Sequence, residues 1–79
     1  MSAHLLREKG LRVTQSRIAV LEILQQRAGQ HMTPEDLVNH LESQGQRIAL
    51  ATVYRVLDFL LQHHMVIKTQ TPHQKTYYE

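Results

Sequence analysis

The sequence predicts a small, mainly helical domain that ends in a β-hairpin. Through about residue 64, apolar residues recur every three or four positions, which is the spacing of amphipathic helices. Glycine and proline residues interrupt this pattern at intervals that suit helix ends. From residue 65 onward the period changes, and short runs of β-branched and aromatic residues follow.

The first two predicted helices lie before Gly29. A short helix is expected from Ala3 to Lys9, ended by Gly10, with Leu5 and Leu6 as its apolar contacts. Thr14 is the expected N-cap of a second helix that extends to about Arg27. The apolar stripe of that second helix consists of Ile18, Val20, Leu21, Ile23 and Leu24.

The third predicted helix opens with Thr33-Pro34-Glu35-Asp36. This run supplies a capping hydroxyl, a proline at the first helical position and two acids near the positive end of the helix dipole. Leu37, Val38 and Leu41 form its buried side, and Gly45 ends it.

The fourth predicted helix runs from about Leu50 to His63 and has two distinct faces. At 100° per residue, one face is apolar and the other is presented to solvent, with Tyr54 at their border. The apolar face holds Val53, Val56, Leu57 and Leu60, and the opposite face holds Ala51, Arg55, Asp58 and Gln62.

The predicted hairpin joins Met65–Thr69 to Thr76–Tyr78 through a turn over Gln70–Lys75. Two helices joined by a short turn, with a leading helix and a following antiparallel ribbon, describe a winged helix-turn-helix domain. We expect this single domain to occupy residues 1–79.

Composition excludes several classes of protein. The chain has no cysteine, so it has no disulfide framework and no cysteine-ligated zinc site. No apolar run approaches the roughly 18 residues of a membrane span, and no signal peptide is recognisable, so we expect a cytoplasmic protein. Paired carboxylates, a glycine-rich phosphate loop and a metal triad are not evident, so we do not expect an enzyme.

Charge is unevenly distributed along the chain, although the formal net charge is only +2. Residues 1–34 carry five basic and two acidic residues, residues 35–46 carry three acidic residues and no basic one, and the remainder is again basic. This arrangement suggests a face for an anionic partner, and an ordinary mixed surface is the alternative. On the fourth helix, Tyr54 beside Arg55 suits DNA recognition, whereas a core tyrosine beside a solvated arginine is the alternative.

The run Ala51-Thr52-Val53-Tyr54-Arg55-Val56-Leu57, preceded by Gly10-Leu11-Arg12-Val13-Thr14 and Thr14-x-x-Arg17, closely resembles the DNA-recognition motifs of the ferric uptake regulator family of bacterial metal-sensing repressors. The resemblance runs from Leu5 to Glu79 and covers the N-terminal half of such proteins. It implies double-stranded DNA with A·T-rich inverted repeats as the partner. It also implies a C-terminal dimerisation and metal domain that is absent here, so the full-length protein is expected to be a homodimer and this fragment a monomer.

The resemblance also implies roles for individual residues. Tyr54 would contact thymine methyl groups, Arg12 would enter a narrow minor groove, and Arg17 would either contact a phosphate or bond to a helix carbonyl. The DNA-binding residues implied in this way are Arg12, Thr14, Arg17, Ala51, Thr52, Tyr54, Arg55, Lys68 and Lys75.

His31 and Glu79 match positions that supply ligands to the family's interdomain metal site. We expect no cofactor in this fragment, and Fe²⁺ or Zn²⁺ in the full-length protein, because the remaining ligands would lie in the absent half. These two residues favour an iron or peroxide sensor, whereas Phe59 within Leu57–Leu61 is similar to zinc-responsive members. We favour the iron-responsive regulator.

Two departures from the family pattern affect the ends of the fourth helix. Ala49 stands where a serine or glycine cap is common, which weakens the cap by about 1 kcal/mol. His64 replaces a usual glycine and would be strained in a left-handed conformation. A function of another class is a winged-helix protein-interaction module anchored by Tyr54 and Phe59.

Overall fold

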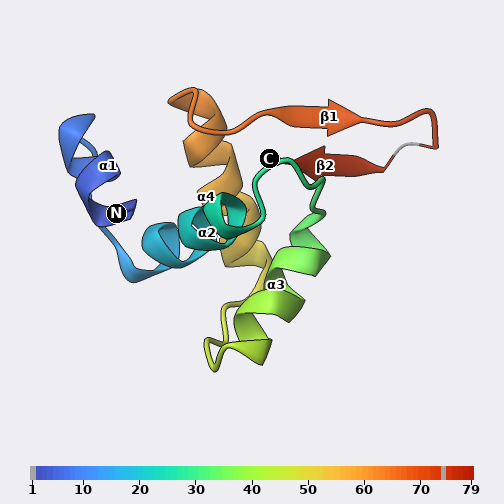
Figure 1. Cartoon of the computed structure of the whole chain (residues 1–79), viewed down its shortest axis with the longest axis horizontal. Coiled ribbons are helices and arrows are strands. Elements are labelled where there is room, and N and C mark those ends of the chain that lie inside the picture. Colours follow the sequence, from blue (N-terminus) through green and yellow to red (C-terminus); the bar gives the residue numbers. More distant parts are fainter. Residues whose placement is uncertain (1, 74) are drawn as a thin grey trace.

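The computed structural model describes residues 2–73 and 75–79, and over these residues it shows four helices followed by a two-stranded antiparallel hairpin (Figure 1). The elements are α1 (Ser2–Glu8), α2 (Gln15–Gln26), α3 (Pro34–Ser43), α4 (Leu50–Gln62), β1 (Lys68–Gln70) and β2 (Thr76–Tyr78). Helices α2, α3 and α4 pack against one another, α1 packs on α2, and the hairpin projects from this body as a wing (Figure 1). The winged helix-turn-helix fold is confirmed.

The predicted starts of α2 and α3 are both confirmed by their capping bonds. The Thr14 hydroxyl oxygen accepts from the backbone N–H of Arg17 at 3.1 Å. At α3, the Thr33 hydroxyl oxygen accepts from the Asp36 N–H at 3.1 Å, and the Asp36 carboxylate accepts from the Thr33 N–H at 3.0 Å. This reciprocal capping box satisfies two donors that a helix start otherwise leaves free.

Both ends of α4 also match their predictions. Ala49 is the N-cap and makes no side-chain capping bond. At the other end, His64 has φ 57°, the left-handed conformation expected for the position that follows the helix. A non-glycine residue stores roughly 1 to 3 kcal/mol of strain in this conformation.

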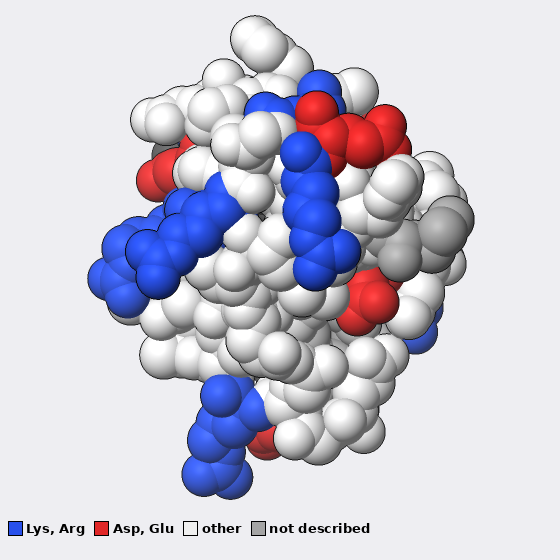
Figure 2. Space-filling model, turned by 90° about the vertical axis from the view of Figure 1, so that its left-hand side faces the viewer, with Lys and Arg blue, Asp and Glu red and all other residues white. Residues whose placement is uncertain are grey.

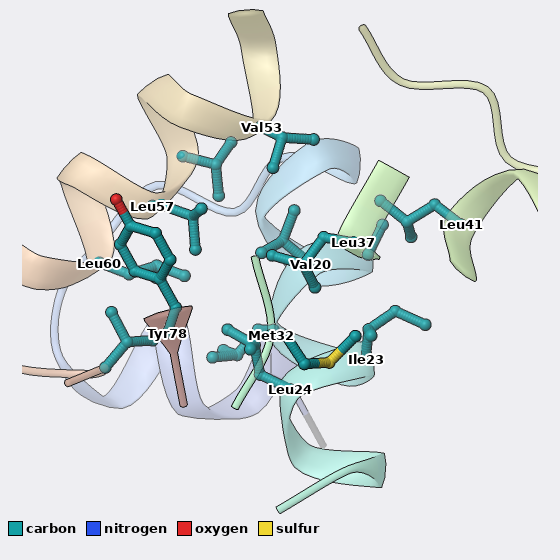
Figure 3. Packing of buried hydrophobic residues seen from close by; sticks show 14 of the residues in the cluster. Val20, Ile23, Leu24, Met32, Leu37, Leu41, Val53, Leu57, Leu60 and Tyr78 are labelled. Atoms are coloured by element: carbon teal, nitrogen blue, oxygen red, sulfur yellow. The ribbon is translucent and has the colours of Figure 1, made fainter. Parts of the chain in front are cut away.

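The core lies where the apolar faces of the helices meet, and the wing contributes one aromatic side chain to it (Figure 3). Tyr78 of β2 is only 3% exposed, and its ring lies against Leu57 and Leu60 of α4. The largest fully buried apolar side chains are Leu6, Val20, Ile23, Leu37, Leu41, Val53, Leu57 and Leu60. All of these belong to the stripes predicted from the sequence.

The first strand was predicted too early. It begins at Lys68 rather than Met65, because Val66 is buried in the core and Met65 packs against it, so this segment connects α4 to the wing. Ile67 already exchanges backbone hydrogen bonds with Glu79, at 2.8 and 3.0 Å. Gln70, expected in the turn, belongs to β1, and Gln74 of that turn lies outside the described residues.

A short bridge attaches the wing to the body. Met32 and Tyr78 exchange backbone hydrogen bonds of 3.1 and 2.7 Å, which forms an antiparallel bridge just before the α3 cap. The wing is thereby held at its base, next to the start of α3, as well as through the side chain of Tyr78.

Candidate nucleic-acid interface

The outer face of α4 presents two adjacent side chains to solvent. Tyr54 is 42% exposed, Arg55 is also exposed, and both stand on a helix whose opposite face is locked into the core. Ala51, one turn earlier, is exposed and small, so a surface can approach the helix closely there. Tyr54 and Arg55 are therefore held in place by the helix and remain accessible to a partner.

Arg55 and Thr52 border a polar hollow between the start of α2 and the side of α4. The Arg55 guanidinium donates to the Thr52 hydroxyl oxygen at 3.2 Å. The hollow has a volume of about 380 Å³ and is lined by Thr14, Ser16, Arg17, Thr52, Arg55, Val56 and Phe59. Two guanidinium groups and three hydroxyls, with no carboxylate in this set, suit an anion such as a phosphate. Ser16 was not predicted as a site residue from the sequence, and its only signal there is a hydroxyl in the first turn of α2.

Arg17 makes an internal contact rather than pointing freely into solvent. Its guanidinium lies 3.4 Å from the centroid of the Phe59 ring, and its Nη1 donates to the backbone carbonyl of Arg12 at 2.8 Å. The acceptor is thus a loop carbonyl and not the helix carbonyl considered from the sequence. A cation–π contact of this kind contributes about 0.5 to 2 kcal/mol.

The loop between α1 and α2 carries the exposed side chain of Arg12. At its end, the hydroxyl oxygen of Thr14 is used as the α2 cap, although the hydroxyl proton remains available for donation. Arg12 and Arg55 therefore stand on different elements, and the side chain of Arg17 lies between those elements.

The wing brings one lysine near Tyr54 and the other to the opposite end of the hairpin. A second hollow, of about 380 Å³, is lined by Thr33, Pro34, Glu35, Tyr54, Lys75 and Thr76. Lys75 is exposed beside this hollow. Lys68, also exposed, pairs with Tyr78 at the base of the wing. The two lysines therefore do not form a single cluster.

Figure 2 shows the end of the molecule on which α1 lies. Lys and Arg side chains extend over this face at several separate places, and acidic groups lie close to several of them. On this face the cations are dispersed between uncharged regions, so an anionic partner would be held at discrete points.

Tyr78 has the one shifted side-chain pKa resolved in the described part of the chain. Burial raises the pKa of its hydroxyl above the usual 10.0, and the charges of Asp58 and Tyr54 on α4 raise it further. The phenol is therefore neutral across the physiological range, which suits its place in the core.

His31 and Glu79 are brought into register by the Met32–Tyr78 bridge. Since the bridge is antiparallel, the residue before Met32 faces the residue after Tyr78. His31 is exposed, and its ring meets Tyr77 edge-on at 5.9 Å. One imidazole and one carboxylate fit the donor types of a transition-metal site but leave it incomplete, and no group of three potential metal-ligating residues occurs among the described residues.

The chain matches the model of the ferric uptake regulator family over residues 8–79. Over 75 residues it is 36% identical to the ferric uptake regulation protein of Haemophilus influenzae, a match that covers 95% of this chain and 51% of that protein. The chain thus spans about half the length of this relative.

Solved structures agree with the match in sequence. The chain superimposes on the Vibrio cholerae ferric uptake regulator with a TM-score of 0.90 and 37% identity, covering all of this chain and 60% of that one. For the Pseudomonas aeruginosa ferric uptake regulator with manganese, the TM-score is 0.91 at 32% identity, covering 100% and 59% of the two chains.

Proposed function

We propose that this chain, which belongs to the ferric uptake regulator family, is the DNA-binding domain of a bacterial metal-responsive transcription repressor. The favoured assignment is the iron-responsive regulator acting on A·T-rich inverted repeats, and a zinc- or peroxide-responsive member is the alternative. The observation that carries the proposal is the exposure of Tyr54 and Arg55 on a helix whose other face is fixed in the core.

In this proposal α4 enters the major groove. The Tyr54 ring packs against thymine methyl groups, and Arg55 donates to a base edge or a phosphate. Small Ala51 allows the start of the helix to approach the bases. The exposed Arg12 extends from its loop into the adjacent minor groove, where a narrow A·T-rich segment attracts a guanidinium.

Backbone phosphates are held at the polar hollow and along the wing. The hydroxyls of Thr14 and Thr52 and the guanidinium of Arg55 line the hollow, and their chemistry suits one phosphate group. Lys68 and Lys75 supply further cations on the wing. These contacts place the helix on the duplex, whereas Tyr54 and Arg55 contribute sequence preference.

Metal and dimerisation belong to the longer protein in this proposal. His31 and Glu79 would contribute two ligands to an Fe²⁺ site, or a Zn²⁺ site in the alternative, that is completed from outside residues 1–79. A metal held there would supply a rigid connection to the dimerising part and so set the distance between two copies of α4 on an inverted repeat. Alone, the chain is expected to bind as a monomer.

The alternative function, a protein-interaction module, requires both Tyr54 and Phe59 to contact an apolar partner, and Phe59 is not freely accessible. Phe59 is half-buried, and the guanidinium of Arg17 lies over its ring. An apolar partner would have to displace that cation, which leaves Tyr54 as the only ready aromatic contact of the two. The surroundings of Tyr54 are polar and include the cations Arg55 and Lys75 as well as Glu35, so they suit a nucleic acid better than an apolar partner.

The test is a fluorescence-anisotropy titration of the 79-residue chain against an A·T-rich inverted repeat and a scrambled duplex at low and moderate salt. We expect weak binding, with a Kd of about 10⁻⁴ to 10⁻⁶ M near physiological salt, and a preference for the repeat. Tyr54→Ala or Arg55→Ala should weaken binding to the repeat by about 5- to 100-fold.

Asn39→Ala is the matched control, because Asn39 is an exposed helical residue of α3 that is not among the residues proposed to touch DNA. It should bind as the parent does. An Arg55→Ala protein with unchanged affinity would remove that residue from the interface. Binding that is absent even at low salt would overturn the proposed function and favour the protein-interaction module.

A further inference from the structure

We infer that Phe59 is a positioning residue for DNA recognition: its ring holds Arg17, and Arg17 holds the backbone of the loop that presents Arg12. This inference rests on the proposed function and adds to it a residue that does not itself need to touch DNA. The three residues belong to three different parts of the chain, namely α4, α2 and the loop between α1 and α2.

We call the chain of contacts from Phe59 through Arg17 to the Arg12 carbonyl the brace. Its first contact joins α4 to α2. Phe59 projects from α4 and packs at the edge of the core, so its ring is a fixed platform. The guanidinium of Arg17 lies 3.4 Å above the ring centroid, which fixes the plane of a side chain that otherwise has many rotamers. The neighbouring ring of His63, at 4.6 Å, limits the freedom of Phe59 in turn.

The second contact joins α2 to the loop. With its guanidinium held by Phe59, Arg17 donates from Nη1 to the carbonyl oxygen of Arg12 at 2.8 Å. The same loop is fixed on either side, because Leu11 donates its N–H to the Leu6 carbonyl at 2.9 Å and Thr14 caps α2. The backbone at Arg12 is therefore ordered before any ligand binds.

Ordering at Arg12 matters because two grooves must be engaged together. Tyr54 and Arg55 lie on the same helix as Phe59, so the brace sets the loop at a defined position relative to the recognition face of α4. A loop that is already ordered loses less conformational entropy on binding than a free one. Removing the ring should therefore weaken the minor-groove contact while leaving the Arg12 side chain intact.

The experiment is a double-mutant cycle in the same anisotropy assay. Phe59→Leu retains an apolar side chain but loses the π face, and it should weaken binding to the A·T-rich repeat by about 3- to 10-fold. Phe59→Tyr retains the π face and should bind as the parent does. In an Arg12→Ala background, Phe59→Leu should have no further effect, because the brace then has no side chain to position.

Leu61→Ala is the control for a purely structural loss, since Leu61 is a half-buried residue of the same helix that packs on the core. Thermal unfolding by circular dichroism confirms that each protein is folded at the assay temperature. Equal weakening by Phe59→Leu with and without Arg12, or no weakening in either, overturns the inference while the proposed function stands. A parent chain that does not bind DNA overturns the proposed function itself.

Discussion

The N-termini of α3 and α4 differ in how their first-turn N–H groups are used. At α3, Thr33 and Asp36 form a complete capping box, and Pro34 occupies a position where no N–H is needed. At α4, Ala49 offers no side-chain oxygen, so the first turn receives no side-chain cap from it. The α4 start also lies beside the hollow lined by two arginines.

The N-terminus of α3 is capped by its own side chains, whereas the N-terminus of α4 leaves its first-turn N–H groups without a side-chain cap from Ala49. The α3 cap stabilises the domain and occupies two of the N–H donors at the helix start, those of Thr33 and Asp36. The α4 start lacks this stabilisation, and no side chain of Ala49 competes for its first-turn N–H groups, which lie at the positive end of the helix dipole. Under the proposed function, these N–H groups are available to a phosphate, and adding a cap tests whether they are used.

The largest expected effect comes from breaking the α3 cap. Thr33→Ala removes the acceptor for the Asp36 N–H and should lower the free energy of unfolding by about 1 to 2 kcal/mol, measured by urea denaturation. Affinity for DNA should stay within twofold of the parent when both proteins are folded. Ser43→Ala, at the exposed end of the same helix, is the control and should change stability little. A large loss of DNA affinity in Thr33→Ala would contradict the division of roles.

A cap added to α4 should raise the stability of the domain and lower its affinity for DNA. Ala49→Ser supplies a hydroxyl acceptor and should raise the free energy of unfolding by about 0.5 to 1 kcal/mol. The same hydroxyl competes with a phosphate for the first-turn N–H groups, so affinity for DNA should fall by about two- to fivefold. Urea denaturation and anisotropy on one preparation measure both quantities. A protein that gains stability without losing affinity would show that these N–H groups do not bind DNA.

The smallest expected effect is on stability at alkaline pH and comes from Tyr78, which connects the segment before α3 to the side of α4. Because burial raises the pKa of Tyr78 in the folded state, the unfolded chain loses this proton first as pH rises. The contribution of this group is fully present below about pH 10 and is lost as pH rises through the raised pKa. Tyr78→Phe should remove this part of the alkaline destabilisation, measured by thermal unfolding at a series of pH values. Tyr77→Phe is the control and should retain it.

Elements with local signals agree most closely with the sequence-based prediction. Thr14 and Thr33 cap α2 and α3 as expected, and the buried side chains of α4 are those that 100° spacing places on one face. These features depend on residues three or four positions apart, so a short stretch of sequence contains the whole interaction.

The first strand shows where a local pattern misleads. Met65 and Val66 are residue types that favour strands, but both pack at the core directly after α4. Strand β1 therefore begins only at Lys68. β-Forming residues indicate a half-buried extended segment and do not specify its partner. The bridge from Met32 to Tyr78 likewise joins residues far apart in the chain, and no nearby signal indicates it.

The four helices, their apolar faces, the winged helix-turn-helix class and the exposure of Tyr54 and Arg55 could all be predicted from the amino-acid sequence, because they follow from periodicity and from capping within one or two turns. The folded chain was needed to show that Arg17 lies on Phe59 and bonds to the Arg12 carbonyl, and that His31 faces Glu79. Such contacts depend on how separate elements pack in three dimensions, and packing is set by the whole core rather than by any one segment.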